Sequence, residues 1–156
     1  MKKVLGMTFA VLAMANIALG ADNTLGSWKY NVAKSQPAAG VSPIKDLIVT
    51  REASDGAVKI SAKGERTDGS QIDTTTVTKY DGKTVEVIGK GLTWDTTAIK
   101  QVNASELTEE RSKKGGQYHS TVHTVISKDG KTMTSTSKGT GADGKPFTAV
   151  AVFDKQ

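Results

Sequence analysis

Hydrophobic and polar residues alternate along much of the chain with a period of two. Val58, Ile60 and Ala62 are separated by polar residues, and near the end of the chain Phe147 and Phe153 share one face with two alanines. Successive side chains of a β-strand point to opposite faces, so this pattern predicts strands with one buried face. The 20 threonines favour the same structure, because β-branched side chains are restricted in helices.

Asp-Gly dipeptides divide the chain at intervals of 13 or 14 residues in two groups. They begin at Asp55, Asp68, Asp81, Asp129 and Asp143. Asp-Gly accepts the positive φ angles of a tight hairpin turn, so each dipeptide predicts a reversal of the chain. Weaker breaks at Lys90-Gly91, near Asn103 and at Gly115-Gly116 fill the remaining interval. The spacing indicates a meander of consecutive hairpins.

These segments predict an all-β domain of nine or ten antiparallel strands. The predicted strands are 26–31, 46–53, 57–66, 70–80, 83–89, 94–101, 104–113, 117–128, 131–140 and 145–154. We also expect one short helix near residues 33–39. An open sheet of this many twisted strands would leave two exposed edges, so we expect an up-and-down barrel. A two-sheet sandwich is the alternative architecture.

The N-terminus has the layout of a secretory signal peptide. Lys2 and Lys3 precede an uncharged, largely apolar stretch that ends at Leu19. Small residues at Ala18 and Gly20 predict cleavage after Gly20, with a second candidate site a few residues earlier, after Ala15. The stretch falls short of the roughly 18–20 strongly apolar residues of a membrane span. We therefore expect a signal peptide helix over 1–20 and one periplasmic or secreted domain over 21–156, without stable membrane insertion.

Composition limits the function classes that the chain can serve. There is no Cys, so thiol chemistry and a lipid anchor on Cys are excluded. Two of the five net positive charges belong to Lys2 and Lys3, which leaves +3 on 21–156. The densest basic cluster, 111–114, directly follows two glutamates and is interpreted as a solvated turn. We therefore expect no nucleic-acid partner, no cofactor and a monomer.

Both ends of the predicted domain resemble a known group of barrels. Gly26-Ser27-Trp28-Lys29 resembles the opening of the lipocalin and fatty-acid-binding (calycin) barrels, and the ending from Val150 to Lys155 resembles their closing strand. The segments 26–35 and 127–134 are similar to small exported bacterial lipocalin-like proteins whose function is largely uncharacterised. The resemblance implies that Trp28 closes the barrel floor and that the strand through Phe153 pairs with the first strand. Lipocalins place an Arg against the opening Trp, and here Lys145 or Lys155 would take that place.

The two histidines are the first candidates for chemistry. His119 and His123 would lie on one face of a strand, but four residues of strand span about 13 Å, too far for two ligands of one ion. Threonine and serine are abundant in any such sheet and do not indicate a nucleophile. We therefore expect neither a metal site nor an enzyme.

The preferred functional hypothesis is an exported binding protein for a small, mainly apolar ligand. Barrels of eight or more strands can enclose one such molecule. We expect Tyr80, Trp94, Tyr118 and Phe147 to line the lumen, and Trp28 and Phe153 to have structural roles. The alternative is a structural or interaction protein of the cell envelope with a filled barrel and no ligand.

Overall fold

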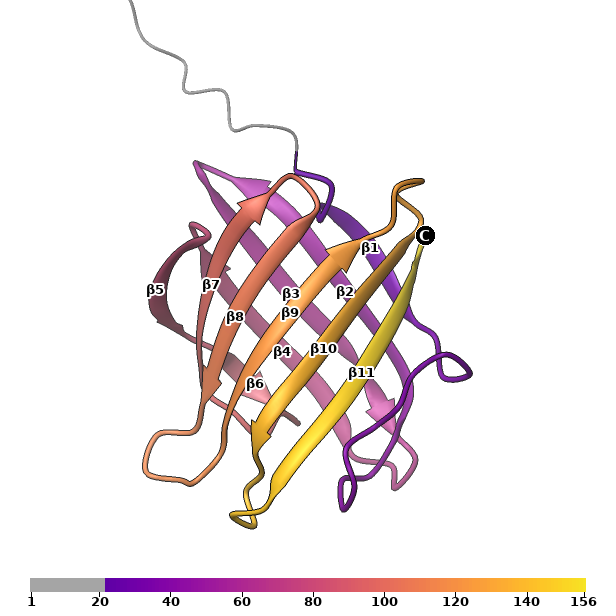
Figure 1. The fold of residues 1–156 in the computed structure, drawn as a ribbon, viewed down its shortest axis with the longest axis vertical. Helices are drawn as coiled ribbons and strands as arrows, with labels where there is room; N and C mark the ends of the chain where they lie inside the picture. Colours follow the sequence, from indigo (N-terminus) through magenta and orange to yellow (C-terminus); the bar gives the residue numbers. More distant parts are fainter. Residues whose placement is uncertain (1–21) are drawn as a thin grey trace, which may run out of the picture.

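The computed structural model describes residues 22–156, which form an all-β domain with no helix (Figure 1). Eleven antiparallel strands make up a single sheet. Their bounds are β1 (Gly26–Tyr30), β2 (Ile44–Ser54), β3 (Ala57–Arg66), β4 (Gln71–Thr78), β5 (Asp81–Glu86), β6 (Ile88–Lys90), β7 (Thr96–Asn103), β8 (Glu106–Ser112), β9 (His119–Ile126), β10 (Thr132–Thr140) and β11 (Pro146–Lys155). The predicted signal peptide, 1–20, lies outside the described residues. No helix within 22–156 is long and apolar enough to span a membrane.

The strands follow one another as a meander that curls into a nearly closed barrel. Their order is β5-β7-β8-β9-β10-β11-β1-β2-β3-β4-β6. The last strand therefore pairs with the first, and Tyr30 lies opposite Phe153. The all-β class and the antiparallel barrel predicted from the sequence are confirmed.

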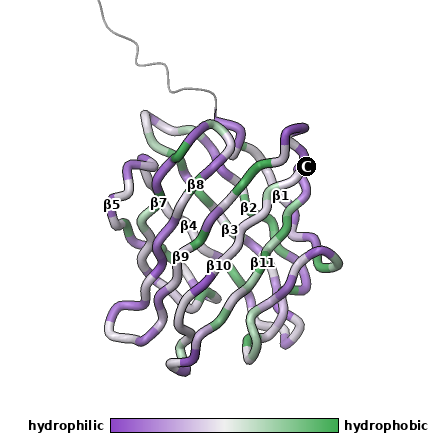
Figure 2. The backbone as a smooth tube through the Cα atoms, in the orientation of Figure 1, coloured by the Kyte–Doolittle hydropathy of each residue, from purple (hydrophilic) through white to green (hydrophobic). Residues whose placement is uncertain are grey.

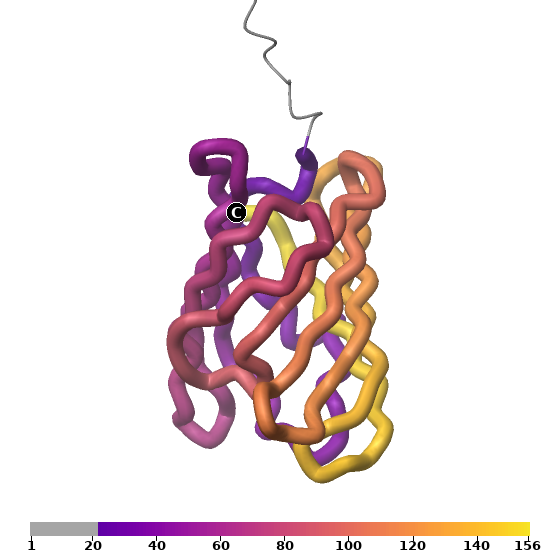
Figure 3. The backbone as a smooth tube through the Cα atoms, turned by 90° about the vertical axis from the view of Figure 1, so that its left-hand side faces the viewer, coloured from indigo at the N-terminus to yellow at the C-terminus, as the bar shows by residue number. Residues whose placement is uncertain are grey.

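The eleventh strand arises where one predicted strand changes its partner. β5 pairs with β7 through Val85 and Thr97, whereas β6 pairs with β4 through Gly89 and Thr74. Val87 alone separates the two short strands. The segment predicted as 83–89 thus joins the two ends of the sheet, on the side of the barrel that Figure 3 turns towards the viewer.

Four of the five Asp-Gly dipeptides form hairpin turns, and the third does not. Asp55 and Gly56 adopt φ angles of 46° and 73° between β2 and β3, as a two-residue hairpin turn requires. Asp81-Gly82 instead begins β5 at a register irregularity, and the residue before it, Tyr80, has the positive φ of 57°. The chain therefore bends at Tyr80, so that the Tyr80 side chain is positioned by strained backbone.

Two glycines allow neighbouring strands to approach closely where the barrel curves. A Cβ on Gly64 of β3 would lie 2.1 Å from the backbone oxygen of Asp46, and one on Gly139 of β10 would lie 2.1 Å from that of His119. Neither position could hold a side chain without displacing backbone. Glycine at such points permits the strong coiling that barrel closure needs.

The connection from β1 to β2 covers the edge of β11 and contains no helix, so the expected helix at 33–39 is wrong. Gln36 and Val150 exchange backbone hydrogen bonds of 2.7 and 2.8 Å, and the Ser35 hydroxyl accepts one from the Val152 amide. Pro37 explains the error, because a residue before proline is disfavoured in helical conformation. Gln36 therefore adopts an extended pairing with β11.

The alternation of hydropathy along the strands corresponds to the two sides of the barrel wall (Figure 2). In β9, Ser120, Val122, Thr124 and Ile126 are buried, while the residues between them are exposed. The larger apolar cluster of the interior consists of Trp28, Tyr30, Leu47, Val49, Ile72, Ile126, Met133 and Phe153. A second cluster consists of Val58, Tyr80, Ile99 and Leu107.

One end of the barrel is closed around Trp28. The indole is fully buried, its Nε1 donates a hydrogen bond of 2.8 Å to the Thr24 carbonyl, and Lys155 Nζ lies 4.9 Å from the ring centroid. Lys155 thus occupies the place that the resemblance gives to an arginine. The segment before β1 crosses this end, where the backbone N–H of Asn23 donates a hydrogen bond of 2.8 Å to the Ala104 carbonyl.

Candidate ligand-binding site

The interior of the barrel contains buried hydroxyl groups as well as apolar side chains. Buried threonine and serine side chains alternate with outward-facing residues on β4, β7, β9 and β10. They are Thr74, Thr76, Thr78, Thr97, Ser120, Thr124 and Ser135. Some of these hydroxyls bond one another, as between Thr124 and Ser135 at 2.8 Å. Buried polar groups need such partners, and none of these hydroxyls is among the buried side-chain atoms left without one.

An ion pair lies among these buried polar groups. Leu107, Glu109 and Arg111 alternate along β8 towards the interior, and Arg111 donates from Nε and Nη2 to the two Glu109 oxygens, both at 2.9 Å. Thr97 donates a third hydrogen bond of 2.6 Å to the carboxylate. Burial alone would raise the pKa of Glu109, but the Arg111 charge and these hydrogen bonds outweigh it and lower that pKa. Glu109 is therefore ionised at neutral pH, and its two oxygens are engaged.

This pair corrects the interpretation of 111–114 as a solvated turn, because Arg111 belongs to the strand. Lys113 and Lys114 do lie in the exposed turn after β8, but Glu109 is buried and Arg111 is half-buried within the strand. Adjacent charges on a strand point to opposite sides of the barrel wall, so Glu110 is exposed while Glu109 is not.

A second guanidinium lies deeper in the interior. Arg51 of β2 follows Leu47 and Val49 on the inward face and is 6% exposed. Its Nη1 donates a hydrogen bond of 2.8 Å to the Tyr80 hydroxyl, which is 3.4 Å from the Thr24 hydroxyl. Arg51 Nε is buried and has no hydrogen-bond partner among the described residues. The hydrogen-bond partner of the charged Arg51 side chain is therefore the neutral Tyr80 hydroxyl, and the buried Nε–H of Arg51 donates to no described residue.

Three of the four aromatic residues predicted to line the lumen stack on one another. The ring centroids of Trp94 and Tyr118 are 5.7 Å apart at an interplanar angle of 19°, and those of Tyr118 and Phe147 are 5.8 Å apart at 26°. Arg111 Cζ lies 4.3 Å from the Trp94 ring centroid, which joins the stack to the ion pair. Trp94 and Phe147 are half-buried, so part of the stack faces solvent.

Tyr80, the fourth predicted residue, lies apart from the stack, and its hydroxyl accepts a hydrogen bond from Arg51. Arg51, Glu109 and Arg111 were not predicted as interior residues from the sequence. The signal that could have found them is the same alternation that identified the strands, because Arg51 continues the inward series of Leu47 and Val49.

The histidines lie on the outer face of β9 and are both exposed. His123 Nε2 lies 2.5 Å from Glu106 Oε1, and His119 Nδ1 lies 3.3 Å from the Gln117 carbonyl. Within 22–156, no three His, Cys, Asp or Glu side chains come close enough together to hold a metal ion.

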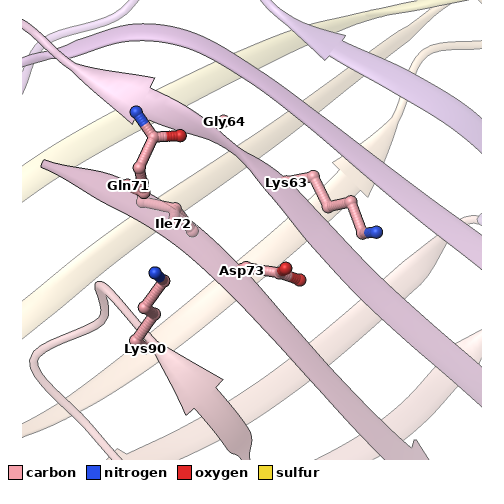
Figure 4. Close-up of a pocket in the computed structure, with 6 residues that line it drawn as sticks. All are labelled: Lys63, Gly64, Gln71, Ile72, Asp73 and Lys90. Carbon is pink, nitrogen blue, oxygen red and sulfur yellow. The ribbon is translucent and has the colours of Figure 1, made fainter. Parts of the chain in front are cut away.

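The outer surface also has a hollow of about 240 Å³ between β3, β4 and β6 (Figure 4). It is lined by Lys63, Gly64, Gln71, Ile72, Asp73 and Lys90. The charged side chains of this group are exposed and of both signs. The hollow lies where Gly64 brings β2 and β3 together, and its charged groups are solvated, so it offers little to hold a ligand.

Searches of protein families and of curated proteins found no match to this chain. The barrel itself, all-strand and nearly closed, is consistent with a calycin-like fold.

Proposed function

We propose that this protein is an exported, non-catalytic, lipocalin-like binding protein for a small, mainly apolar molecule. The observation that carries the proposal is the partly exposed stack of Trp94, Tyr118 and Phe147 in a barrel whose interior also holds an apolar cluster. The predicted signal peptide supports export, because secretory signals direct a chain out of the cytoplasm.

The position of the stack supports access from one end of the barrel. Trp94 lies in the connection before β7, Tyr118 directly precedes β9, and Phe147 is the second residue of β11. Gly139 pairs with both Phe147 and Ser120, which places the stack at the barrel end opposite the one that Trp28 closes. Half-buried aromatic rings at such a mouth offer apolar area that a ligand can cover.

Titration with N-phenyl-1-naphthylamine, a neutral apolar fluorophore, tests this proposal. We expect a saturable increase in its fluorescence and energy transfer from Trp94. Phe147→Ala should weaken binding about tenfold or more, because covering an aromatic side chain contributes about 1.5–3 kcal/mol. Val102→Ala is the control, since Val102 is exposed on the outer face near the other end. Equal affinities for the two variants would contradict the proposed site.

The alternative, an interaction protein of the envelope, has one specific observation in its favour. Val77 and Ile88 are 53% and 64% exposed on the outer face, where the β4–β6 ladder ends at Thr75. This alternative predicts that the fluorophore does not bind, and that Val77→Ser with Ile88→Ser reduces cosedimentation of the protein with envelope fragments.

A further inference from the structure

We infer that Asp55, in the turn between β2 and β3, is a site of spontaneous isoaspartate formation. This modification needs neither a ligand nor an enzyme and is independent of the binding function. The reaction joins an aspartyl side chain to the backbone nitrogen of the next residue, and it is easiest before glycine, which has no side chain to hinder the approach. The chain contains five Asp-Gly dipeptides, so differences among them come from the fold.

Both reacting groups are hydrogen-bonded in the turns that begin at Asp68, Asp129 and Asp143. Each of these carboxylates accepts a hydrogen bond from the backbone N–H two residues later, at 2.9, 3.1 and 3.1 Å respectively. The N–H of each following glycine donates to the backbone carbonyl two residues before the aspartate, at 3.0, 2.9 and 3.0 Å. Ring closure requires the nitrogen to lose its proton and the carboxyl group to move onto it, so these bonds must break first.

The fourth dipeptide, Asp81-Gly82, is also held. The Asp81 carboxylate accepts a hydrogen bond of 3.0 Å from the Lys83 N–H and lies 3.6 Å from the Lys83 ammonium. The backbone hydrogen bond is the main cause that lowers the pKa of Asp81, and hydrogen bonds also lower the pKa values of Asp68 and Asp129. The ring closes more readily on the neutral carboxyl group than on the carboxylate, so these lowered pKa values further slow the reaction.

Asp55-Gly56 lacks all of these restraints. Within the described part of the chain, the Asp55 carboxylate accepts no hydrogen bond and the Gly56 N–H donates none. Both residues are exposed, and a Cβ placed on Gly56 would have no atom within 4 Å, so the turn has room for a ring. The two groups that must meet are therefore both unbonded at this Asp-Gly dipeptide.

The reaction is a dehydration followed by a hydrolysis. The Gly56 nitrogen attacks Asp55 Cγ, a bond forms between these two atoms, and one Cγ–O bond breaks as water leaves with the proton of the nitrogen. Water then opens the resulting succinimide. Opening at Cγ restores aspartate, whereas opening at the main-chain carbonyl leaves the backbone running through Cβ and Cγ, with the α-carboxylate as the side group. The two-residue turn beside the Ser54–Ala57 pair is then longer by one methylene.

Peptide mapping of the folded protein during incubation at pH 7.5 and 37 °C measures the five sites separately. Trypsin leaves each Asp-Gly on its own peptide, and Asp55 lies on 52–59. An isoaspartyl peptide keeps its mass but elutes at a different time. We expect isoaspartate at Asp55 to accumulate about tenfold or more faster than at any other Asp-Gly, because hydrogen bonds to a charged group must break at the others. In guanidinium chloride, where these bonds are lost, the five rates should agree within about threefold.

Asp55→Asn and Asp129→Asn form a matched pair that removes the effect of ionisation. Asparagine closes the same ring with loss of ammonia, and the conversion of amide to acid is read as a change in mass. An asparagine oxygen at 129 can still accept the hydrogen bonds of Ser127 and Lys131. We expect the folded Asp55→Asn protein to deamidate about tenfold or more faster than folded Asp129→Asn, and the two to deamidate at similar rates when unfolded.

Three results would each overturn the assignment. The first is another Asp-Gly that reacts as fast as Asp55 in the folded protein, or equal rates for the two folded variants. The second is a tenfold preference for Asp55 that persists after unfolding, which would place its cause in the local sequence. The third is the absence of isoaspartate at Asp55 in the folded protein over a period in which the unfolded protein is modified, which would show that the fold protects this turn as well.

Discussion

Replacing Glu109 by glutamine should destabilise the fold strongly, because it leaves two guanidinium groups in the interior without a carboxylate. Arg111 makes two charge-assisted hydrogen bonds of 2.9 Å to Glu109, and such bonds contribute about 1.5–3 kcal/mol each. Glutamine keeps the shape and can still accept the Thr97 hydrogen bond. The Arg111 side chain is 19% exposed, so water relieves part of the loss. We therefore expect Glu109→Gln to lower the free energy of unfolding by about 3 kcal/mol, the lower end of the range for a buried ion pair that loses one partner.

Urea and thermal unfolding followed by circular dichroism would measure this loss. For a domain of this size, about 3 kcal/mol corresponds to a decrease in Tm of roughly 10 °C. Glu110→Gln is the control, because Glu110 is exposed on the same strand. This substitution should change the free energy of unfolding by no more than about 0.5 kcal/mol. Glu109→Leu combined with Arg111→Met should recover much of the stability, since apolar replacement of a whole pair is often neutral. A Glu109→Gln variant within about 1 kcal/mol of the unaltered protein would refute the reasoning.

Three further predictions concern Glu109, Gly139 and Lys155. The pKa of Glu109 is lower in the folded protein than the value of 4.5 expected in the unfolded chain, so ionised Glu109 stabilises the fold above pH 4.5. This contribution is lost as the pH falls through the folded-state pKa. The difference in unfolding free energy between the unaltered protein and Glu109→Gln should therefore narrow between pH 7 and pH 3 in urea titrations. Gly139→Ala should cost at least about 2 kcal/mol, because its Cβ would meet backbone at 2.1 Å, whereas Lys138→Ala should unfold at nearly the same urea concentration as the unaltered protein. Lys155→Gln, which removes the ammonium 4.9 Å from the Trp28 ring, should lower stability by about 0.5 kcal/mol and alter the Trp28 emission; unchanged emission would argue against that contact.

The sequence predicted the fold well because barrel strands depend on local signals. Period-two alternation and Asp-Gly turns identified most strands to within a few residues. The exchange of partners at Val87 could not be predicted, because no turn residue marks it and pairing partners are set by the whole sheet. The helix expected near 33–39 was wrong for a local reason, since Pro37 restricts Gln36 to an extended conformation.

The site was predicted less completely than the fold. Trp94, Tyr118 and Phe147 were candidates because aromatic residues are few in this chain, and the structure stacks them. Arg51 and Glu109 were not predicted in the interior, because charged residues are expected at the surface. Their burial depends on partners that strand periodicity cannot assign. Tyr80, between two strands, partners Arg51, and Thr97 of β7 joins Arg111 in holding Glu109.

Native mass spectrometry of the protein isolated from its own host tests the binding function most directly. The account predicts a species heavier than the bare chain by the mass of one small molecule, which is released when the protein unfolds. Incubation with N-phenyl-1-naphthylamine should convert the remaining bare protein to a one-to-one complex, and Phe147→Ala should reduce that conversion. A spectrum that shows the bare chain alone, both as isolated and after incubation with N-phenyl-1-naphthylamine, would contradict the account.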